Sequence, residues 1–292
     1  MEFQDYGNYL SEERKMSENT KKAYIRDIRS FEAFIKKRGI ESTDEAESPE
    51  ILAYLMELRT QNKSKATLNR KLASLRFYYN YLRNKGTIKN NPADGIKSPR
   101  AEKKEIEYIS IEDIDRLMAL PDNSAKGIRD RAILELLYAT GIRASELIEM
   151  NTEDVNLRMG FVKCTPQHGK ARIIPMGRIC RKAMEDYILD VREKLLRGND
   201  RPVLFVNYAG KPITRQGLWK VLKEYGEAAE LSVSLTPQVL RNSFAVHMLQ
   251  NGADVKSLQE LMGHEDISAT QAYLAVVKNR IKDVYDKAHP RA

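Results

Sequence analysis

Long apolar runs, cysteine and histidine are all scarce in this sequence, and each shortage excludes a class of protein. No segment approaches the length of uninterrupted apolar sequence that crosses a bilayer. The first residues, MEFQDYGNYL, have neither a basic start nor an apolar core, so we expect no signal peptide and a cytoplasmic protein. The two cysteines, Cys164 and Cys180, lack partners at metal-ligand spacing, and only four histidines are present. We therefore expect reduced thiols and no metal site.

Positive charge, in contrast, is plentiful. The 292 residues carry a formal net charge of +8, with a pI near 9.2. Such an excess favours a polyanionic partner such as nucleic acid, although many basic proteins have none. A Gly-rich phosphate-binding loop is missing, so we expect no nucleotide cofactor. The partner we expect is a macromolecule, with no role for a membrane or a small-molecule substrate.

Residues 1–90 are predicted to form a helical domain. In SENTKKAYIRDIRSFEAFIKKRG, apolar residues recur on one helical face. A second helix follows in SPEILAYLMELR, with Ser48 as N-cap and Pro49 at the first helical position. A third has an apolar stripe over 68–82 and a polar, basic surface beside it. The candidate DNA-binding residues on that surface are Lys65, Asn69, Arg70 and Arg76. A solvated charged face explains the pattern equally well.

A linker over residues 91–107, rich in proline, glycine and charge, separates this domain from a second one at 108–292. Ser110 and Asp113 stand at capping-box spacing where the second domain begins its first helix. The β-rich segments GFVKC and ARIIP, joined by a turn, predict a hairpin over 160–175. Helical patterns fill the rest. The predicted fold is mainly α: a helical N-terminal domain, and a mostly helical α+β domain with a small antiparallel sheet.

Two segments of the second domain place arginines at helix starts. ATGIRASEL puts Arg143 just after the break at Gly141. SLTPQVLRNSF begins a helix with Thr236 as N-cap, and it places Gln238 and Arg241 three residues apart on one face. Each arginine alone is typical of a salt bridge or a surface.

A third segment, ELMGHEDISATQAYL, combines a histidine with a tyrosine. An apolar helical pattern stops at Gly263, His264 follows at once, and a new helix starts near Asp266 and carries Tyr273. A tyrosine hydroxyl can attack a phosphodiester and store the bond as a phosphotyrosine ester. Two arginines can hold the negative charge of the transition state, and a histidine can donate a hydrogen bond or move a proton. This chemistry requires no metal and no cofactor.

These motifs resemble the signature boxes of the tyrosine recombinases (the phage-integrase family), and they are most similar to those of Xer-type resolvases. The resemblance covers nearly the whole chain. It implies a SAM-like core-binding domain followed by a catalytic recombinase domain, with double-stranded DNA of paired half-sites as partner. It also implies a homo-tetramer, or a hetero-tetramer with a second recombinase, in which the C-terminal tail docks on a neighbouring protomer. The catalytic residues that it implies are Arg143, Arg241, His264 and Tyr273.

Two positions depart from the family pattern. Gln238 stands where the family has a histidine, and it can still contact a phosphate oxygen. Gln167 stands where the family has the lysine that protonates the leaving 5′ oxygen, and an amide cannot donate that proton. We expect Lys170 to serve as general acid instead, with Lys163 and His168 nearby in sequence. The alternative is that Lys170 contacts only the DNA backbone.

Three functions are consistent with this pattern. The first is site-specific strand exchange through a 3′-phosphotyrosyl intermediate, which retention of Tyr273 and both arginines favours. The second is a catalytically degraded DNA-binding partner of an active recombinase, which the two glutamines favour. The third is nicking of the type IB topoisomerase kind. The sequence leaves open the target site and whether the event is chromosome-dimer resolution or the integration or excision of a mobile element.

Overall fold

The computed structural model divides the chain into two compact units, residues 1–104 and 105–292. The residues that it describes are 2–99, 105–165, 171–264 and 266–288, with the backbone alone for residue 2 and for 279–288. Among them, no helix is both long enough and apolar enough to cross a membrane.

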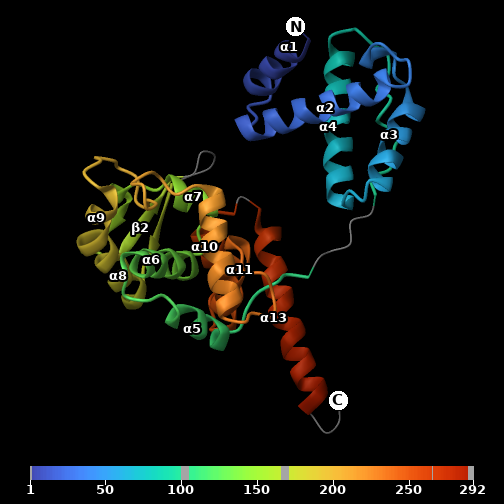
Figure 1. The fold of residues 1–292 in the computed structure, drawn as a ribbon. Coiled ribbons are helices and arrows are strands. Elements are labelled where there is room, and N and C mark those ends of the chain that lie inside the picture. Colours follow the sequence, from blue (N-terminus) through green and yellow to red (C-terminus); the bar gives the residue numbers. More distant parts are fainter. Residues whose placement is uncertain (1, 100–104, 166–170, 265, 289–292) are drawn as a thin grey trace. The chain divides into compact units, whose positions relative to one another are not determined.

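Helices make up the N-terminal unit (Figure 1). They are α1 (Glu2–Asn8), the π-helical turn η1 (Tyr9–Glu13), α2 (Glu18–Lys36), the 3-10 turn η2 (Thr43–Glu45), α3 (Ser48–Thr60) and α4 (Lys65–Asn84). Ser17 and Ser64 cap α2 and α4, each accepting a 3.2 Å hydrogen bond from a backbone N–H three residues on. The apolar stripes predicted for these two helices are buried in one core, around Ile28, Phe31 and Leu72. The helical N-terminal domain predicted from the sequence is confirmed.

The start of α3 differs by one residue from the prediction. Glu47, not Ser48, is the N-cap, and it forms a capping box with Glu50, whose carboxylate accepts the Glu47 backbone N–H at 2.9 Å. Ser48 is the first helical residue, and its hydroxyl donates to the carbonyl oxygen of Pro92 at 2.7 Å. The predicted cap is wrong because this long-range hydrogen bond removes the serine from the local one.

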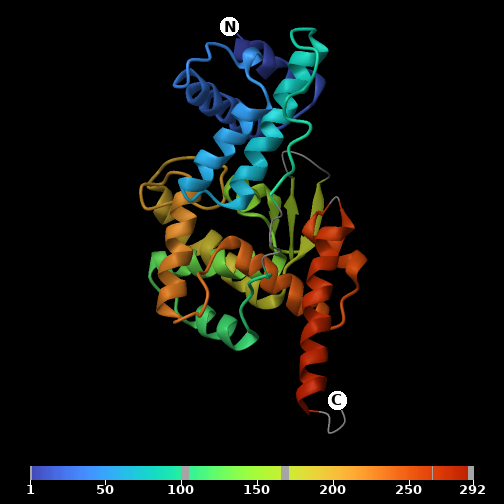
Figure 2. The same cartoon turned by 90° about the vertical axis from the view of Figure 1, so that its right-hand side faces the viewer.

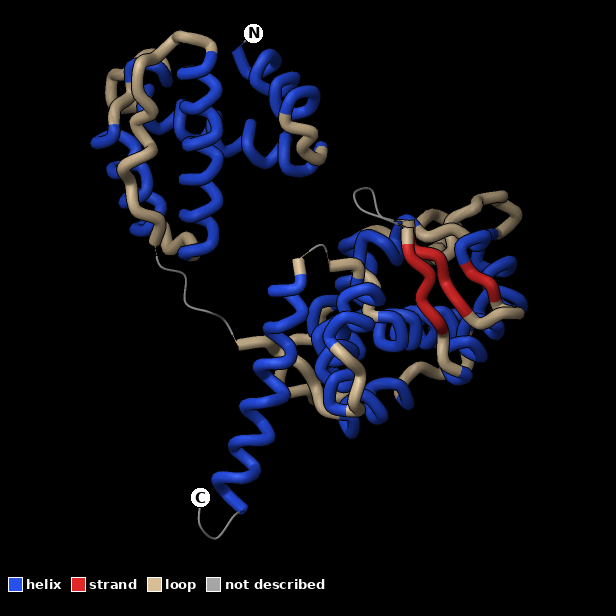
Figure 3. The backbone as a smooth tube through the Cα atoms, turned by 180° about the vertical axis from the view of Figure 1, so that it is seen from behind, coloured by secondary structure: helices blue, strands red, loops and turns tan. Residues whose placement is uncertain are grey.

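The C-terminal unit is also mostly helical, with a small sheet at one edge (Figure 3). Its helices are α5 (Ile111–Ala119), α6 (Ala125–Thr140), α7 (Ala144–Glu149), α8 (Arg178–Glu185), α9 (Arg192–Leu196), α10 (Arg215–Ala228), α11 (Pro237–Gln250), α12 (Val255–Met262) and α13 (Ile267–Ala288), with the short turns η3 (Thr152–Asp154) and η4 (Asp186–Val191). The capping box of Ser110 and Asp113 at the start of α5 is confirmed, as is the Thr236 cap of α11.

Three antiparallel strands form the sheet in the order β1 (Val155–Asn156), β2 (Phe161–Cys164), β3 (Arg172–Pro175). The pairing of β2 with β3 confirms the predicted hairpin, in a register that sets Cys164 opposite Arg172. The sequence did not indicate β1, because two residues are too few to show an alternating pattern. The observed fold is the one predicted: mainly α with one small antiparallel sheet.

Two cores hold the C-terminal unit together. The larger one buries α6, the sheet and α8–α10, whereas a smaller cluster joins α11, α12 and α13. The smaller cluster includes Phe244, Leu258 and Tyr273. The C-terminal part of α13 extends beyond the body of the unit (Figures 1 and 2). The segments SLTPQVLRNSF and ELMGHEDISATQAYL therefore meet where α11, α12 and α13 pack.

Candidate active site

The four residues singled out from the motifs come from four different elements. Arg143 is the N-cap residue of α7, Arg241 lies in α11, His264 follows the end of α12, and Tyr273 is in α13. Left-handed glycines end two of the preceding helices: Gly141 closes α6 at φ +58°, and Gly263 closes α12 at φ +63°. Both conformations favour glycine, so the chain turns at these points as the sequence predicts.

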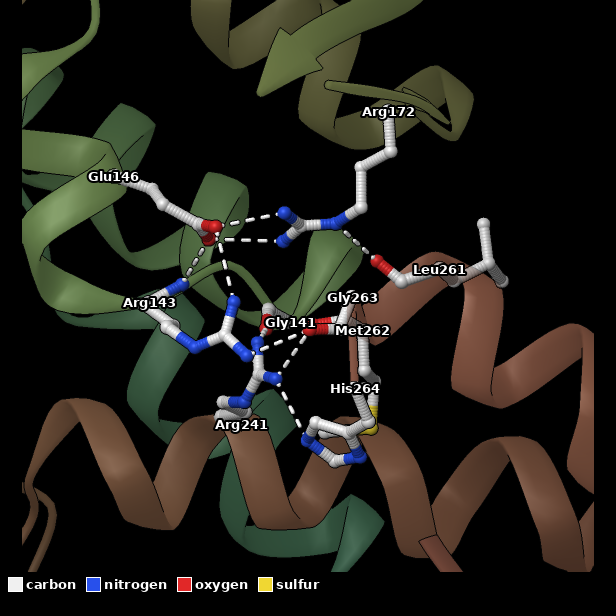
Figure 4. A network of polar contacts seen from close by, with 9 residues as sticks. All are labelled: Gly141, Arg143, Glu146, Arg172, Arg241, Leu261, Met262, Gly263 and His264. Carbon is white, nitrogen blue, oxygen red and sulfur yellow. Dashed lines mark hydrogen bonds and ion pairs between the residues drawn. The ribbon is translucent and has the colours of Figure 1, made fainter. Parts of the chain in front are cut away.

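The end of α12 is the centre of a network of arginines (Figure 4). Three successive carbonyl oxygens of this helix end each accept from a different arginine: Leu261 from Arg172 Nε at 2.7 Å, Met262 from Arg241 Nη2 at 2.7 Å, and Gly263 from Arg143 Nη2 at 2.8 Å. The last carbonyls of a helix have no partner within it and carry partial negative charge. The helix break before His264 therefore serves to gather three cations as well as to turn the chain.

Glu146, which the sequence analysis did not single out, ties two of these arginines together. Its oxygens accept from Arg172 Nη1 at 2.7 Å and Nη2 at 2.9 Å, from the Arg143 backbone N–H at 2.7 Å, and from Arg143 Nη1 at 3.2 Å. Burial alone would raise the pKa of this carboxyl, but the hydrogen bonds from Arg172 and Arg143 outweigh it and hold the pKa below its usual value. The only sequence signal was its capping-box spacing of three residues from Arg143.

Arg241 is buried, and its side chain is held at both ends of the guanidinium. Nη1 donates to the carbonyl of Gly141, and Nη2 reaches His264 Nε2 at 2.9 Å. Burial, and then the neighbouring Arg143, lower the pKa of Arg241 to about 10, so it remains a cation at neutral pH. The site therefore keeps a fixed positive charge beside His264.

His264 is neutral at physiological pH. Burial, followed by repulsion from Arg241 and Arg143, lowers its pKa to about 4. Because Arg241 can only donate, Nε2 must accept, and the ring proton is on Nδ1, 2.9 Å from Thr270 Oγ1. A phosphate oxygen placed on Arg241 would free Nε2 from this contact.

Tyr273 lies beside His264, with only 6% of its surface exposed. Its ring is parallel to that of His264, with centroids 6.4 Å apart. The hydroxyl donates to Asn242 Oδ1 at 2.9 Å. Burial raises the pKa of the phenol, and Arg241 and the amide of Gln238 counter this effect in part. Thus the arginines, His264 and Tyr273 share one site, and Asn242 is a further member that the sequence analysis missed.

Gln238 contacts this site from its edge. It is exposed, and its Nε2 donates to Asn242 Oδ1 at 2.7 Å. Its expected contact with a phosphate stays a prediction. Lys170, Gln167 and His168 lie outside the described residues, so the placement of the general acid stays a prediction too. Lys163 is on β2 with an exposed side chain.

Intramolecular contacts hold Asn69, Arg70 and Arg76, three candidate DNA-binding residues on α4. Arg70 pairs with the buried carboxylate of Asp27, Arg76 donates to the carbonyls of Ala93 and Ile96, and Asn69 Nδ2 donates to the carbonyl of Pro99 at 2.9 Å. Lys65, at the start of the helix, is exposed. Contact of these residues with DNA remains a prediction, and their structural roles are an independent reason for their presence.

Within the part of the chain that the structure describes, no group of histidine, cysteine and acidic residues is arranged to hold a metal ion. The chemistry that this arrangement can perform is the binding of a tetrahedral anion between Arg143 and Arg241, next to a phenol and a neutral imidazole.

Comparisons with known proteins agree with this geometry. The phage integrase family matches residues 107–280, and the N-terminal SAM-like domain of phage integrases matches residues 3–86. "Tyrosine recombinase XerD" of Oceanobacillus iheyensis is 40% identical over 291 residues, covering 99% of this chain and 98% of that protein. The protein of the same name from Listeria monocytogenes serotype 4b is 39% identical over 292 residues, with the same two shares covered.

Solved structures show the same fold. The Tn1549 transposon integrase in complex with transposon right-end DNA matches with a TM-score of 0.74 at 19% identity, covering 98% of each chain. The XerH recombinase in a post-cleavage complex with its difH substrate also matches with a TM-score of 0.74 at 19% identity, covering 91% of this chain and 78% of that one. With its family models, its relatives and its site in agreement, the chain belongs to the phage integrase family, the tyrosine recombinases.

Proposed function

We propose that Tyr273 is the nucleophile of a site-specific recombinase and that Arg143 and Arg241 hold the scissile phosphate. The single observation that carries the proposal is the convergence of these residues with His264 on one site, although 130 positions separate Arg143 from Tyr273 in the sequence. A protein that only bound DNA would have no use for a phenol at a pair of phosphate-binding arginines. The relatives named as tyrosine recombinases favour the enzyme over a degraded DNA-binding partner.

The reaction is a transesterification. The Tyr273 oxygen forms a bond to phosphorus and loses its proton, while the bond from phosphorus to the 5′ oxygen breaks and that oxygen gains a proton. The product is a 3′-phosphotyrosyl ester and a free 5′ hydroxyl. Arg143 and Arg241 stabilise the charge on the non-bridging oxygens. His264 Nε2, freed from Arg241, takes up the proton that Tyr273 loses and then donates a hydrogen bond to one of these oxygens. Reversal with a second strand completes the exchange.

We assign the proton for the leaving oxygen to Lys170, because Gln167 cannot supply it. Arg172, the first residue of β3, fixes the nearest described part of the hairpin to Glu146 and to the end of α12. This fixed base of the hairpin, two positions from Lys170 in the sequence, supports the assignment.

Double-stranded DNA is the substrate in this proposal. The net charge of +8, the DNA in the complexes of the structural relatives, and the exposed Lys65 all support it. The two units grip one half-site together, and four protomers assemble on two sites, with the tail of α13 docking on a neighbour. The projection of α13 beyond its own unit supports that exchange (Figure 2). The resemblance of the motifs to those of Xer-type resolvases favours chromosome-dimer resolution over mobile-element integration.

Covalent trapping tests the proposal. A duplex site is first selected from a randomised pool by binding, then nicked so that the strand end is lost after cleavage. The wild type is expected to form a protease-sensitive adduct with the 3′ end at the cut, and Tyr273→Phe is expected to bind the same duplex without forming it. Absence of any adduct, on ordinary DNA and on DNA with sulfur at the bridging 5′ position, would refute the enzyme.

A further inference from the structure

Asn242 joins the nucleophile to the segment through which the chain enters the C-terminal unit. Its Oδ1 accepts from the Tyr273 hydroxyl at 2.9 Å and from Gln238 Nε2 at 2.7 Å. Its Nδ2 donates to the carbonyl oxygen of Glu107 at 2.8 Å. Both polar atoms of this buried side-chain amide are therefore used, and because the Glu107 carbonyl can only accept, the NH₂ group must face the strand of chain that contains it, which leaves Oδ1 for Tyr273.

The entering segment, residues 105–109, is here called the strap. A second hydrogen bond fixes the strap to α11: the Ile109 N–H donates to Oγ of Ser243, the residue after Asn242, at 3.0 Å. Ile106 and Tyr108 of the strap pack against the small core that contains Tyr273. Part of the strap, part of α11 and the helix α13 that carries Tyr273 thus share one small core, while Ile109 of the strap and Leu240 of α11 belong to the larger core of the unit.

The hydroxyl of Tyr273 is in a resting position in this arrangement. It must lose its proton to attack phosphorus, but its partner is an amide oxygen, which cannot take up a proton at neutral pH. The side chain is also almost fully covered. Attack therefore requires the hydrogen bond to Asn242 to break, and the strap keeps Asn242 in the orientation that makes it.

We propose that Asn242 is a positioning residue that holds Tyr273 in a resting position set by the strap, so that displacement of the strap releases the nucleophile. This inference rests on the proposed role of Tyr273.

Two substitutions of Asn242 separate holding from packing. Asn242→Ala removes the acceptor, so Tyr273 is released. Asn242→Asp keeps an acceptor of the same shape, so Tyr273 stays held, although the donor to Glu107 is lost. A third variant, Ser243→Ala, loosens the strap and leaves Asn242 intact. Thr43→Val is the matched control, since it removes a buried hydroxyl that bonds Tyr78 in the other unit.

The first measurement needs no DNA. Nitration of Tyr273 by tetranitromethane, followed by peptide mass spectrometry, reports release of the phenol in the full-length protein. We expect Asn242→Ala and Ser243→Ala to accelerate nitration about three- to tenfold, the effect of one hydrogen bond. Asn242→Asp and Thr43→Val are expected to match the wild type. A rate for Ser243→Ala equal to that of the wild type would show that the strap does not hold the nucleophile.

The second measurement is the rate of adduct formation on the nicked duplex at saturating protein, with the dissociation constant for DNA measured alongside. Asn242→Ala and Ser243→Ala are expected to raise the rate by a similar factor at unchanged affinity. Equal losses for Asn242→Ala and Asn242→Asp would reduce Asn242 to a packing residue. If even the wild type forms no adduct, the proposed function fails, whereas the nitration series still decides whether the strap holds Tyr273.

Discussion

Replacing Glu146 by glutamine should destabilise the C-terminal unit strongly, because it breaks a buried ion pair on one side only. The side chains of Glu146 and Arg172 are 4% and 10% exposed, with Arg172 Nη1 2.7 Å from Glu146 Oε1. Glutamine keeps the shape but turns an NH₂ group toward a guanidinium that can only donate. Arg172 would then be left buried without a counter-charge.

The magnitude follows from that geometry. Removing one partner of a buried pair costs about 3–5 kcal/mol. For a unit of this size, each 1 kcal/mol lowers Tm by about 2–4 °C, so the lower end of the range corresponds to a fall of roughly 6–12 °C. Removing both charges, in Glu146→Gln with Arg172→Gln, should cost less than the two single substitutions together, since no unpaired charge remains.

The assay is urea unfolding followed by fluorescence of Trp219, the one tryptophan of the chain, which is on α10 and so reports the C-terminal unit. Since the folded-state pKa of Glu146 is below its usual value of 4.5, its stabilising effect is complete above about pH 4.5. That effect is lost as the pH falls through the folded-state value. The difference between wild type and Glu146→Gln should therefore shrink on acidification from pH 6 to pH 3. A difference below about 1 kcal/mol at pH 7, or one that grows in acid, would refute the reasoning.

Three further predictions concern the reaction and the assembly. Lys170→Ala should slow cleavage by a factor of about 10²–10⁴. Most of this loss should vanish on DNA with a bridging 5′ sulfur, because a thiolate leaves without a proton. An effect of Lys170→Ala on DNA binding alone would reject Lys170 as the acid. If no acid is present, Gln167→Lys should instead restore cleavage of ordinary DNA. Truncation after Lys278 should abolish cooperative binding to two half-sites in a gel-shift titration while sparing a single half-site, and unchanged cooperativity would reject exchange of the tail. Gly263→Ala should lower the stability of the folded protein by about 1–2 kcal/mol through the left-handed backbone alone. The added Cβ would also lie 2.9 Å from Arg172 Nη1, so we expect less adduct. Normal adduct formation would show that the three arginines tolerate a shifted helix end.

Signals from residues close together in the chain determined most of the fold. Gly141 and Gly263 end their helices because the chain turns there through a left-handed backbone conformation that favours glycine. Thr236 begins α11 because its hydroxyl accepts a hydrogen bond from the backbone N–H three residues on. The hairpin followed from two short β-rich segments on either side of a turn. The resemblance of the motifs to a known family then indicated which arginines, histidine and tyrosine to consider together.

Tertiary structure alone decided how those residues are held. Glu146 meets Arg172 across 26 positions, Tyr273 meets Asn242 across 31, and Asn242 meets the strap across 135. Helix and turn patterns extend over about four residues, so no local pattern specifies which distant donor fills a given acceptor. Burial decides the pairing instead. A polar group that is removed from water needs a hydrogen-bond partner in the protein, and the packing of the helices determines which groups are close enough to serve.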